Sequence, residues 1–118
     1  MIDDPRQFAT DWVADWNRHD IEAILRHFHE DVVFASPIAR AVVPDSAGVV
    51  RGKAALRDYW KRALAKAPDL HFTLIDVYFG VGAIVIHYRD QRGGRANEVL
   101  IFEGMQVRQG FGTRQSAG

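Results

Sequence analysis

Glu98 is the residue of this sequence with the clearest potential for acid–base chemistry. It lies in an apolar segment, and by strand alternation Leu100 and Phe102 would share its face. A carboxyl on such a face loses its water, which raises its pKa and makes it a candidate general acid or base. A structural ion pair is an equal alternative. The arginines that could form it are Arg51, Arg89 and Arg95.

His87 and Tyr88 are the other two candidate catalytic residues, because their predicted strand precedes the strand of Glu98. In one hairpin register His87 would face Glu98. In the other register Tyr88 would share the face of Glu98 and His87 would point outward. A single histidine on a strand is more often structural or exposed than catalytic. The sequence leaves both registers open.

The first predicted helix would have to cover the sheet that carries these residues. Asp3 or Asp4 followed by Pro5 is a typical helix start. Trp12 and Trp16 stand one helical turn apart, so both project from the same side of the helix. Two indoles on one side require a wide apolar surface, or a cavity that they line.

Two further helices are predicted before the chain turns to strands. One should start at Asp20 and end at residues 30–31, and the other should cover residues 52–67. Residues 32–34 are β-branched and aromatic enough for a strand. Residues 38–51 contain several turn formers and should be an irregular connection.

From residue 70 onward apolar residues alternate with polar ones, as in strands. The predicted strands are residues 70–80, 83–89, 97–103 and 105–111, with a turn at residues 90–95. Three helices followed by an antiparallel meander predict an α+β fold, with the helices on the concave face of a curved sheet. We expect one domain over residues 1–111 and a flexible tail over residues 112–118.

Length and composition fit one globular domain and exclude several classes of function. The 118 residues include 15 basic and 15 acidic side chains, so the basic excess of a nucleic-acid-binding protein is absent. There are no cysteines, no signal-peptide pattern at the N-terminus and no segment long enough to span a membrane. We therefore expect a cytoplasmic protein with no nucleic-acid or membrane partner.

The four histidines other than His87 do not predict a metal site. They are His19, His27, His29 and His71. Their spacing would not bring three ligands to one ion, and histidines near helix ends often interact with the last carbonyls. We expect no metal and no cofactor.

Four stretches resemble the nuclear transport factor 2-like superfamily in its SnoaL-like or ketosteroid isomerase-like branch. They are residues 12–24, 30–37, 51–60 and 98–102. The resemblance runs to about Gly110 and is specific for the fold rather than for one activity. It implies a cone, in which helices close one side of a bent sheet around a pocket. It also implies a homodimer that forms through the outer sheet face.

The same resemblance argues against ketosteroid isomerase-type chemistry. The position of the proton-shuttling base falls at Ser36, and a hydroxyl without a neighbouring base cannot take a proton from carbon at a useful rate. The position of the tyrosine donor falls at Trp12, and those of its supporting tyrosines fall at Phe28 and Trp60. The acid position is kept at Glu98. Polyketide cyclases of the family use a histidine and an acid on the sheet, so a His87–Glu98 pair would resemble their dyad.

The cone should hold an aromatic pocket for a small apolar or aromatic molecule. The expected pocket residues are Trp12, Trp16, Phe28, Ser36, Tyr59, Trp60, Phe72 and Phe102. Any single ring could instead serve as core, since aromatic side chains usually do. Three functions remain open. They are a binding module, a cyclase, isomerase or dehydratase that uses Glu98, and a dimerisation or protein-interaction module with a filled cone.

Overall fold

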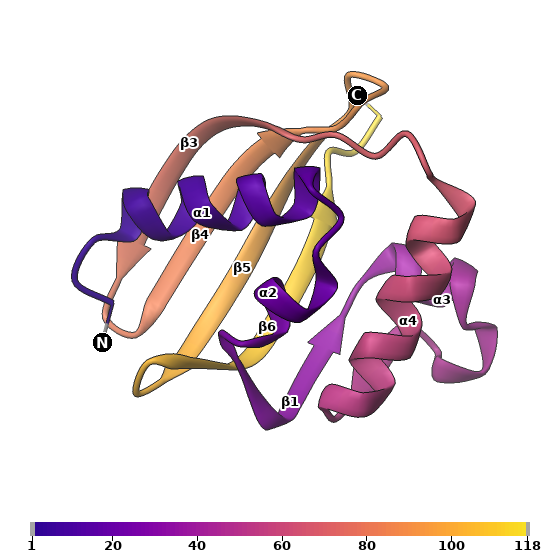
Figure 1. Ribbon diagram of the computed structural model, residues 1–118, viewed down its shortest axis with the longest axis horizontal. Coiled ribbons are helices and arrows are strands. Elements are labelled where there is room, and N and C mark those ends of the chain that lie inside the picture. Colours follow the sequence, from indigo (N-terminus) through magenta and orange to yellow (C-terminus); the bar gives the residue numbers. More distant parts are fainter. Residues whose placement is uncertain (1, 118) are drawn as a thin grey trace.

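The computed structural model describes residues 2–117, with helices gathered around one six-stranded sheet (Figure 1). The helices are α1 (Pro5–Asn17), α2 (Ile21–Leu25), α3 (Pro37–Val42) and α4 (Lys53–Lys66), with a short 3-10 helix η1 (Pro44–Ser46). The strands are β1 (Phe28–Ala35), β2 (Val49–Arg51), β3 (Thr73–Gly80), β4 (Ala83–Arg89), β5 (Arg95–Glu103) and β6 (Gln106–Arg114).

The strand order across the sheet is β2–β1–β6–β5–β4–β3. Every neighbouring pair is antiparallel except β1 and β6, which are parallel. The α+β class is confirmed, and the sheet is mixed rather than purely antiparallel because the first strand pairs with the last one. This pairing joins the helical half of the chain to the strand meander.

The helices begin where their capping residues predict. The Asp4 carboxylate accepts a hydrogen bond from the Gln7 backbone N–H at 3.0 Å, and Asp20 accepts one from Ala23 at 3.1 Å. Figure 1 shows α1 lying across the sheet over β4 and β5, with α4 beside β1. None of the helices within residues 2–117 is long and apolar enough to cross a membrane.

Two predicted boundaries are wrong. The second helix ends at Leu25, and Phe28 already belongs to β1, where its backbone pairs with Val107 of β6. The connection expected over residues 38–51 contains α3, η1 and β2. Ser36 explains α3, because its hydroxyl accepts the Ile38 backbone N–H at 3.1 Å and a proline follows at the first helical position.

The C-terminal boundary of the sheet also lies beyond its predicted place. β6 continues to Arg114, so three residues of the expected flexible tail pair with β5. Gly112 stands opposite Glu98, and Arg114 stands opposite Ala96. The last strand therefore places its final residues beside Glu98 and Ala96 of β5.

The core lies between the helices and the inner sheet face. Its fully enclosed side chains are Ile24, Leu25, Phe28, Val32, Leu56, Ile86, Leu100 and Val107. The parallel strands approach closely where Gly110 of β6 pairs with Phe34 of β1. A Cβ built on Gly110 would lie 2.7 Å from Phe34 Cδ1, so only glycine leaves room for the ring.

Replacing Gly110 with alanine should therefore destabilise the fold. Overpacking a core in this way costs about 1–3 kcal/mol, and we expect a loss of that size in the free energy of unfolding, measured by urea titration. Gly80→Ala is the matched control, since a Cβ at Gly80 would meet nothing within 4 Å. Equal stability of the two variants would contradict the close approach of β1 and β6.

Candidate functional site

A small cavity of about 70 Å³ lies against Glu98 on the inner side of the sheet. We call it the chamber. Its walls include the predicted residues Trp12, Trp16, Ser36, Tyr59, Trp60, Phe72, Tyr88 and Glu98. Residues that the sequence did not indicate complete the lining: Phe34, Ile38, Ala63, Leu70, Gly112, Thr113 and Arg114. Aromatic side chains therefore surround a narrow space.

A larger cavity of about 380 Å³ adjoins the chamber and opens to the surface. We call it the vestibule. The two cavities share the lining residues Ile38, Ala63, Leu70, Phe72, Tyr88 and Arg114. The remaining walls of the vestibule are Val42, Lys66, Ala67, Asp90, Gln91 and Arg92. Pockets for small organic molecules usually enclose about 300–1,000 Å³, so the vestibule has the size for a ring system and the chamber for a substituent.

The register of the β4–β5 hairpin selects Tyr88 rather than His87 as the neighbour of Glu98. Ile86 pairs with Glu98, and Tyr88 pairs with Ala96, so Tyr88 and Glu98 lie on the same, inner face. His87 pairs with Asn97 and lies on the outer face. The predicted alternative of a His87–Glu98 dyad is therefore wrong. His87 lines a separate polar hollow with Arg95, Asn97 and Gln115.

Glu98 is buried without a compensating partner. The residue is 5% exposed, and its carboxyl accepts no hydrogen bond from residues 2–117. Burial raises the pKa of Glu98 to about 8, and the positive charge of Arg114 opposes that rise. The ion pair proposed as an alternative, with Arg51, Arg89 or Arg95, does not form within the described residues. At neutral pH the side chain is mainly protonated and can donate a hydrogen bond.

Tyr59, Ser36 and Tyr88 form the polar surroundings of Glu98. Burial raises the pKa of Tyr59 to about 12, and a hydrogen bond with Ser36 works in the opposite direction. Burial also raises the pKa of Tyr88, with a further contribution from the charge of Glu98. Ser36 Oγ already accepts the N-cap hydrogen bond of α3, so this serine has a structural task and no basic neighbour.

The indole nitrogens of Trp12 and Trp16 are buried and have no acceptor within residues 2–117. An unpaired buried donor costs about 1–3 kcal/mol. Trp12 stacks on Phe72 with ring centroids 5.7 Å apart, and Phe72 lies 4.3 Å from the ring of Tyr88. The aromatic walls therefore pack tightly against one another while two of their polar groups stay unsatisfied.

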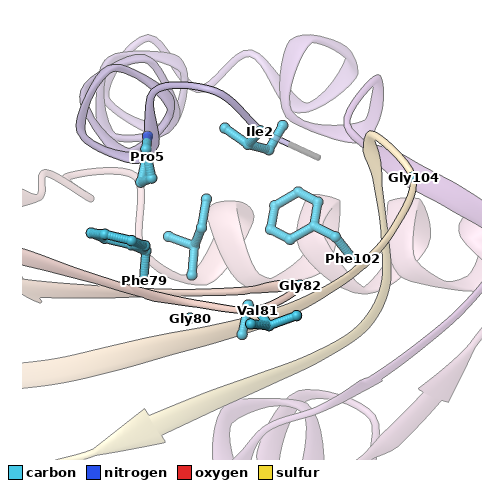
Figure 2. Close-up of a pocket in the computed structure, with 10 residues that line it drawn as sticks. Ile2, Pro5, Phe79, Gly80, Val81, Gly82, Phe102 and Gly104 are labelled. Atoms are coloured by element: carbon cyan, nitrogen blue, oxygen red, sulfur yellow. The ribbon is translucent and has the colours of Figure 1, made fainter.

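Two of the predicted pocket residues lie elsewhere. Phe28 is fully buried and packs edge-on against Trp60 at 5.3 Å, so it belongs to the core. Phe102 packs edge-on against Phe8 of α1 with ring centroids 5.4 Å apart, farther along β5 and away from the chamber. Figure 2 shows Phe102 with Ile2 and Val81 in a different surface cavity of about 230 Å³ near the N-terminus.

Polar side chains at the end of α1 hold the segment that follows α4 against the site. Asn17 Nδ2 donates to the Phe72 carbonyl at 3.0 Å, and Asn17 Oδ1 accepts the Phe72 N–H at 2.7 Å. His19 Nε2 lies 2.9 Å from the Leu70 carbonyl oxygen. These bonds fix the positions of Leu70 and Phe72, which line both cavities. The Trp-Asn-Arg-His pattern carried this signal in the sequence, but only as a fold motif.

Arg114 is the main cavity-lining residue that the sequence did not predict. Its guanidinium donates to the Asp90 carboxylate, and its side chain lines both cavities. Asp90 also accepts hydrogen bonds from the backbone of Arg92 and Gly94, each at 2.9 Å, which builds the β4–β5 turn. Residues 112–118 are predicted to be a flexible tail because the Gly, Thr and Gln around Arg114 give no strand pattern.

No group of three or more His, Asp or Glu side chains within residues 2–117 is arranged to hold a metal ion. His27 packs against Phe8 with ring centroids 5.1 Å apart, and His29 lies 3.5 Å from the Glu103 carboxylate. These histidines thus serve in packing and in a surface contact.

The profile of the SnoaL-like domain matches residues 9–110 of the chain. A SnoaL-like protein of unknown function from Burkholderia thailandensis has a similar structure, with 34% identity and a TM-score of 0.88 over 95% of this chain and 94% of its own. No protein of curated function shows significant sequence similarity to the chain.

More distant structures share the fold alone. TerC, co-crystallised with polyporic acid, has 15% identity and a TM-score of 0.75, with 95% of this chain and 92% of its own covered. Bal32a, from a soil-derived mobile gene cassette, has 17% identity and a TM-score of 0.78, with 95% and 89% covered.

The raised pKa of Glu98 predicts how the free energy of unfolding depends on pH. The Glu98 pKa of about 8 lies above its ordinary value of 4.5, so the folded protein keeps a proton that the unfolded chain releases between these values. Stability should fall as pH rises through this window. Glu98→Gln should remove the effect, so its free energy of unfolding relative to wild type should increase from about pH 4.5 to about pH 8.

Chemical denaturation at several pH values measures this difference. Glu30→Gln, which removes a surface carboxyl, controls for the change in net charge. A constant difference between Glu98→Gln and wild type across the window would contradict the raised pKa of Glu98.

Proposed function

Because the chain belongs to the SnoaL-like family, we propose that it binds a small apolar or aromatic molecule in the vestibule and chamber. The observation that carries this proposal is the carboxyl of Glu98, which is 5% exposed, unpaired and placed on the wall of an aromatic cavity. A buried polar group without a partner weakens the folded state. A ligand group that hydrogen-bonds with Glu98 would supply the missing partner.

The sizes of the two cavities support a particular placement of the ligand. The chamber, at about 70 Å³, is much smaller than the vestibule, at about 380 Å³. A ring system therefore occupies the vestibule, between Ile38 and Phe72, and extends one substituent toward Glu98. The co-crystal of TerC with polyporic acid supports the idea that this fold admits a small organic molecule.

A second candidate function is acid–base catalysis on the bound molecule. A carboxyl with a pKa of about 8 exchanges its proton close to neutral pH, where a general acid or base is most effective. Tyr88 shares its face of the sheet and could donate a hydrogen bond to a developing oxyanion. Glu98 would then move the proton in an isomerisation, cyclisation or dehydration.

The third function, a protein-interaction module with a filled cone, receives less support. The vestibule remains open at about 380 Å³ beside the chamber. A domain that served only as a scaffold would gain stability by filling this space with side chains.

Ala63 offers a direct test of ligand binding, because it lines both cavities on α4. A ligand at about a hundred times its dissociation constant stabilises the native state by about 2.7 kcal/mol, which a thermal-shift assay detects. We expect hits for wild type among steroids, polyketide-like aromatics and fatty acids. Ala63→Trp should lose them, because the indole would fill the passage between the cavities.

Ala55→Trp is the matched control, since Ala55 lies on the exposed side of the same helix. It should keep the wild-type hits. No hit for wild type across the panel would overturn the binding proposal and favour the interaction module. For any hit, product formation that Glu98→Gln abolishes would favour the enzyme over the binding module.

We also propose a homodimer through the outer face of the sheet. An apolar row crosses five strands there, and each residue pairs directly with the next: Tyr78, Val85, Val99, Phe111 and Ala35. Tyr78 is 57% exposed and Phe111 is 36% exposed. A contiguous apolar surface of this kind is typical of a protein interface.

Val99→Glu should weaken this dimer, because Val99 lies in the middle of the row and a buried charge opposes association. Light scattering after size-exclusion chromatography should show a dimer for wild type and a monomer for the variant. Thr10→Glu adds the same charge on an exposed position of α1 and should stay dimeric. A monomeric wild type would contradict the proposal.

For the compartment we propose the cytoplasm. The absence of cysteine among the 118 residues suits a reducing environment, in which disulfides contribute nothing to stability.

A further inference from the structure

The charged side chains around the vestibule do not balance. Its lining contains the cations Lys66, Arg92 and Arg114, and a single anion, Asp90. Glu98, in the chamber behind them, adds little negative charge near neutral pH because burial raises its pKa to about 8. The entrance therefore carries an excess of positive charge in a protein whose formal net charge is zero.

Asp90 is already committed to other partners. Its carboxylate accepts the backbone N–H groups of Arg92 and Gly94 and a hydrogen bond from Arg114, and its side chain is 10% exposed. Of the three cations, Arg114 alone has Asp90 as its partner. Lys66 and Arg92 form no ion pair within residues 2–117.

Arg114 is placed where the two cavities meet, and Asp90 holds it there. Its side chain is 34% exposed and lines both the chamber and the vestibule. A guanidinium has five N–H donors, and the bond to Asp90 uses one nitrogen, so further donors remain for a ligand. Arginine is also the side chain best suited to a planar anion such as a carboxylate.

Because these cations lie beside the apolar wall of the vestibule, we infer that the ligand of the proposed site is a ring-containing organic anion. Its ring lies against Ile38, Ala63 and Phe72, and its anionic group faces Arg114 with Arg92 and Lys66 nearby. The inference rests on the proposed function and narrows it from apolar molecules in general to aromatic or alicyclic acids. The apolar wall supplies burial, and the unpaired cations supply attraction and orientation.

Pairs of acids and their neutral amides test this inference. The probes are benzoic, 2-naphthoic and biphenyl-4-carboxylic acids with the corresponding primary amides, titrated into the full chain by calorimetry. The acid and amide of each pair match in ring and nearly in size, so their affinities differ mainly through charge. We expect the best acid to bind at least about fivefold more tightly than its amide, as a contribution of about 1 kcal/mol from partly exposed charges gives.

The double variant Lys66→Gln with Arg92→Gln removes the two unpaired cations and leaves Arg114 and the folded core untouched. It should bind the acid about two- to fivefold more weakly and the amide within about twofold of wild type. Arg62→Gln is the control, since Arg62 lies on α4, pairs with Asp58 and lines neither cavity. Raising the salt from about 20 mM to about 0.5 M should weaken binding of the acid alone.

The outcomes distinguish failure of the anion inference from failure of the proposed ligand-binding function. Equal binding of acid and amide, unchanged in the double variant, overturns the anion inference and leaves a neutral-ligand pocket standing. Absence of binding for all six probes overturns the anion inference, and the thermal-shift panel then decides whether the proposed function stands. Binding of an acid that Ala63→Trp does not affect places the anion outside this site and also overturns the inference.

Discussion

The parallel pairing of β1 with β6 is the constraint on which the rest of this structure depends. It places the first strand of the chain beside the last one, so Ser36 at the end of β1 comes next to Gly112. Without it, Phe34 and Ser36 would have no reason to approach Glu98. The pairing requires Gly110 to have no side chain, because the ring of Phe34 occupies that space. The missing Cβ of Gly110 therefore allows the end of β1 to lie beside Glu98 of β5.

The orientation of Glu98 could be predicted from the sequence, because alternation along β5 needs only local pattern. The residue that neighbours Glu98 on β4 could not be predicted from the sequence. The β4–β5 register depends on the turn that Asp90 builds through its hydrogen bonds from Arg92 and Gly94. Arg114 was hidden for a related reason. The end of its strand, residues 112–114, has no apolar alternation, so only the pairing with β5 defines these residues as part of a strand.

The aromatic residues show where pattern and packing diverge. Trp12, Trp16 and Trp60 line the chamber, whereas Phe28 lies fully within the core. Periodicity predicts which residues are buried. Whether a buried ring lines a cavity or fills the core depends on how closely it packs against neighbouring side chains. Helix α3 is different, since Ser36 followed by Pro37 is a local helix start that turn formers downstream obscured.

Asp90 joins two structural tasks in one carboxylate, the closure of the β4–β5 turn and the placement of Arg114. Glu98 stands inside the strand pairing, where every substitution disturbs neighbours on both sides. The turn, by contrast, is bounded by solvent and tolerates exchange of its exposed residues. During evolution the two parts of the site can therefore change separately. Substitutions in the β4–β5 turn can alter which ligand the vestibule prefers, while Glu98 in the chamber is inherited unchanged.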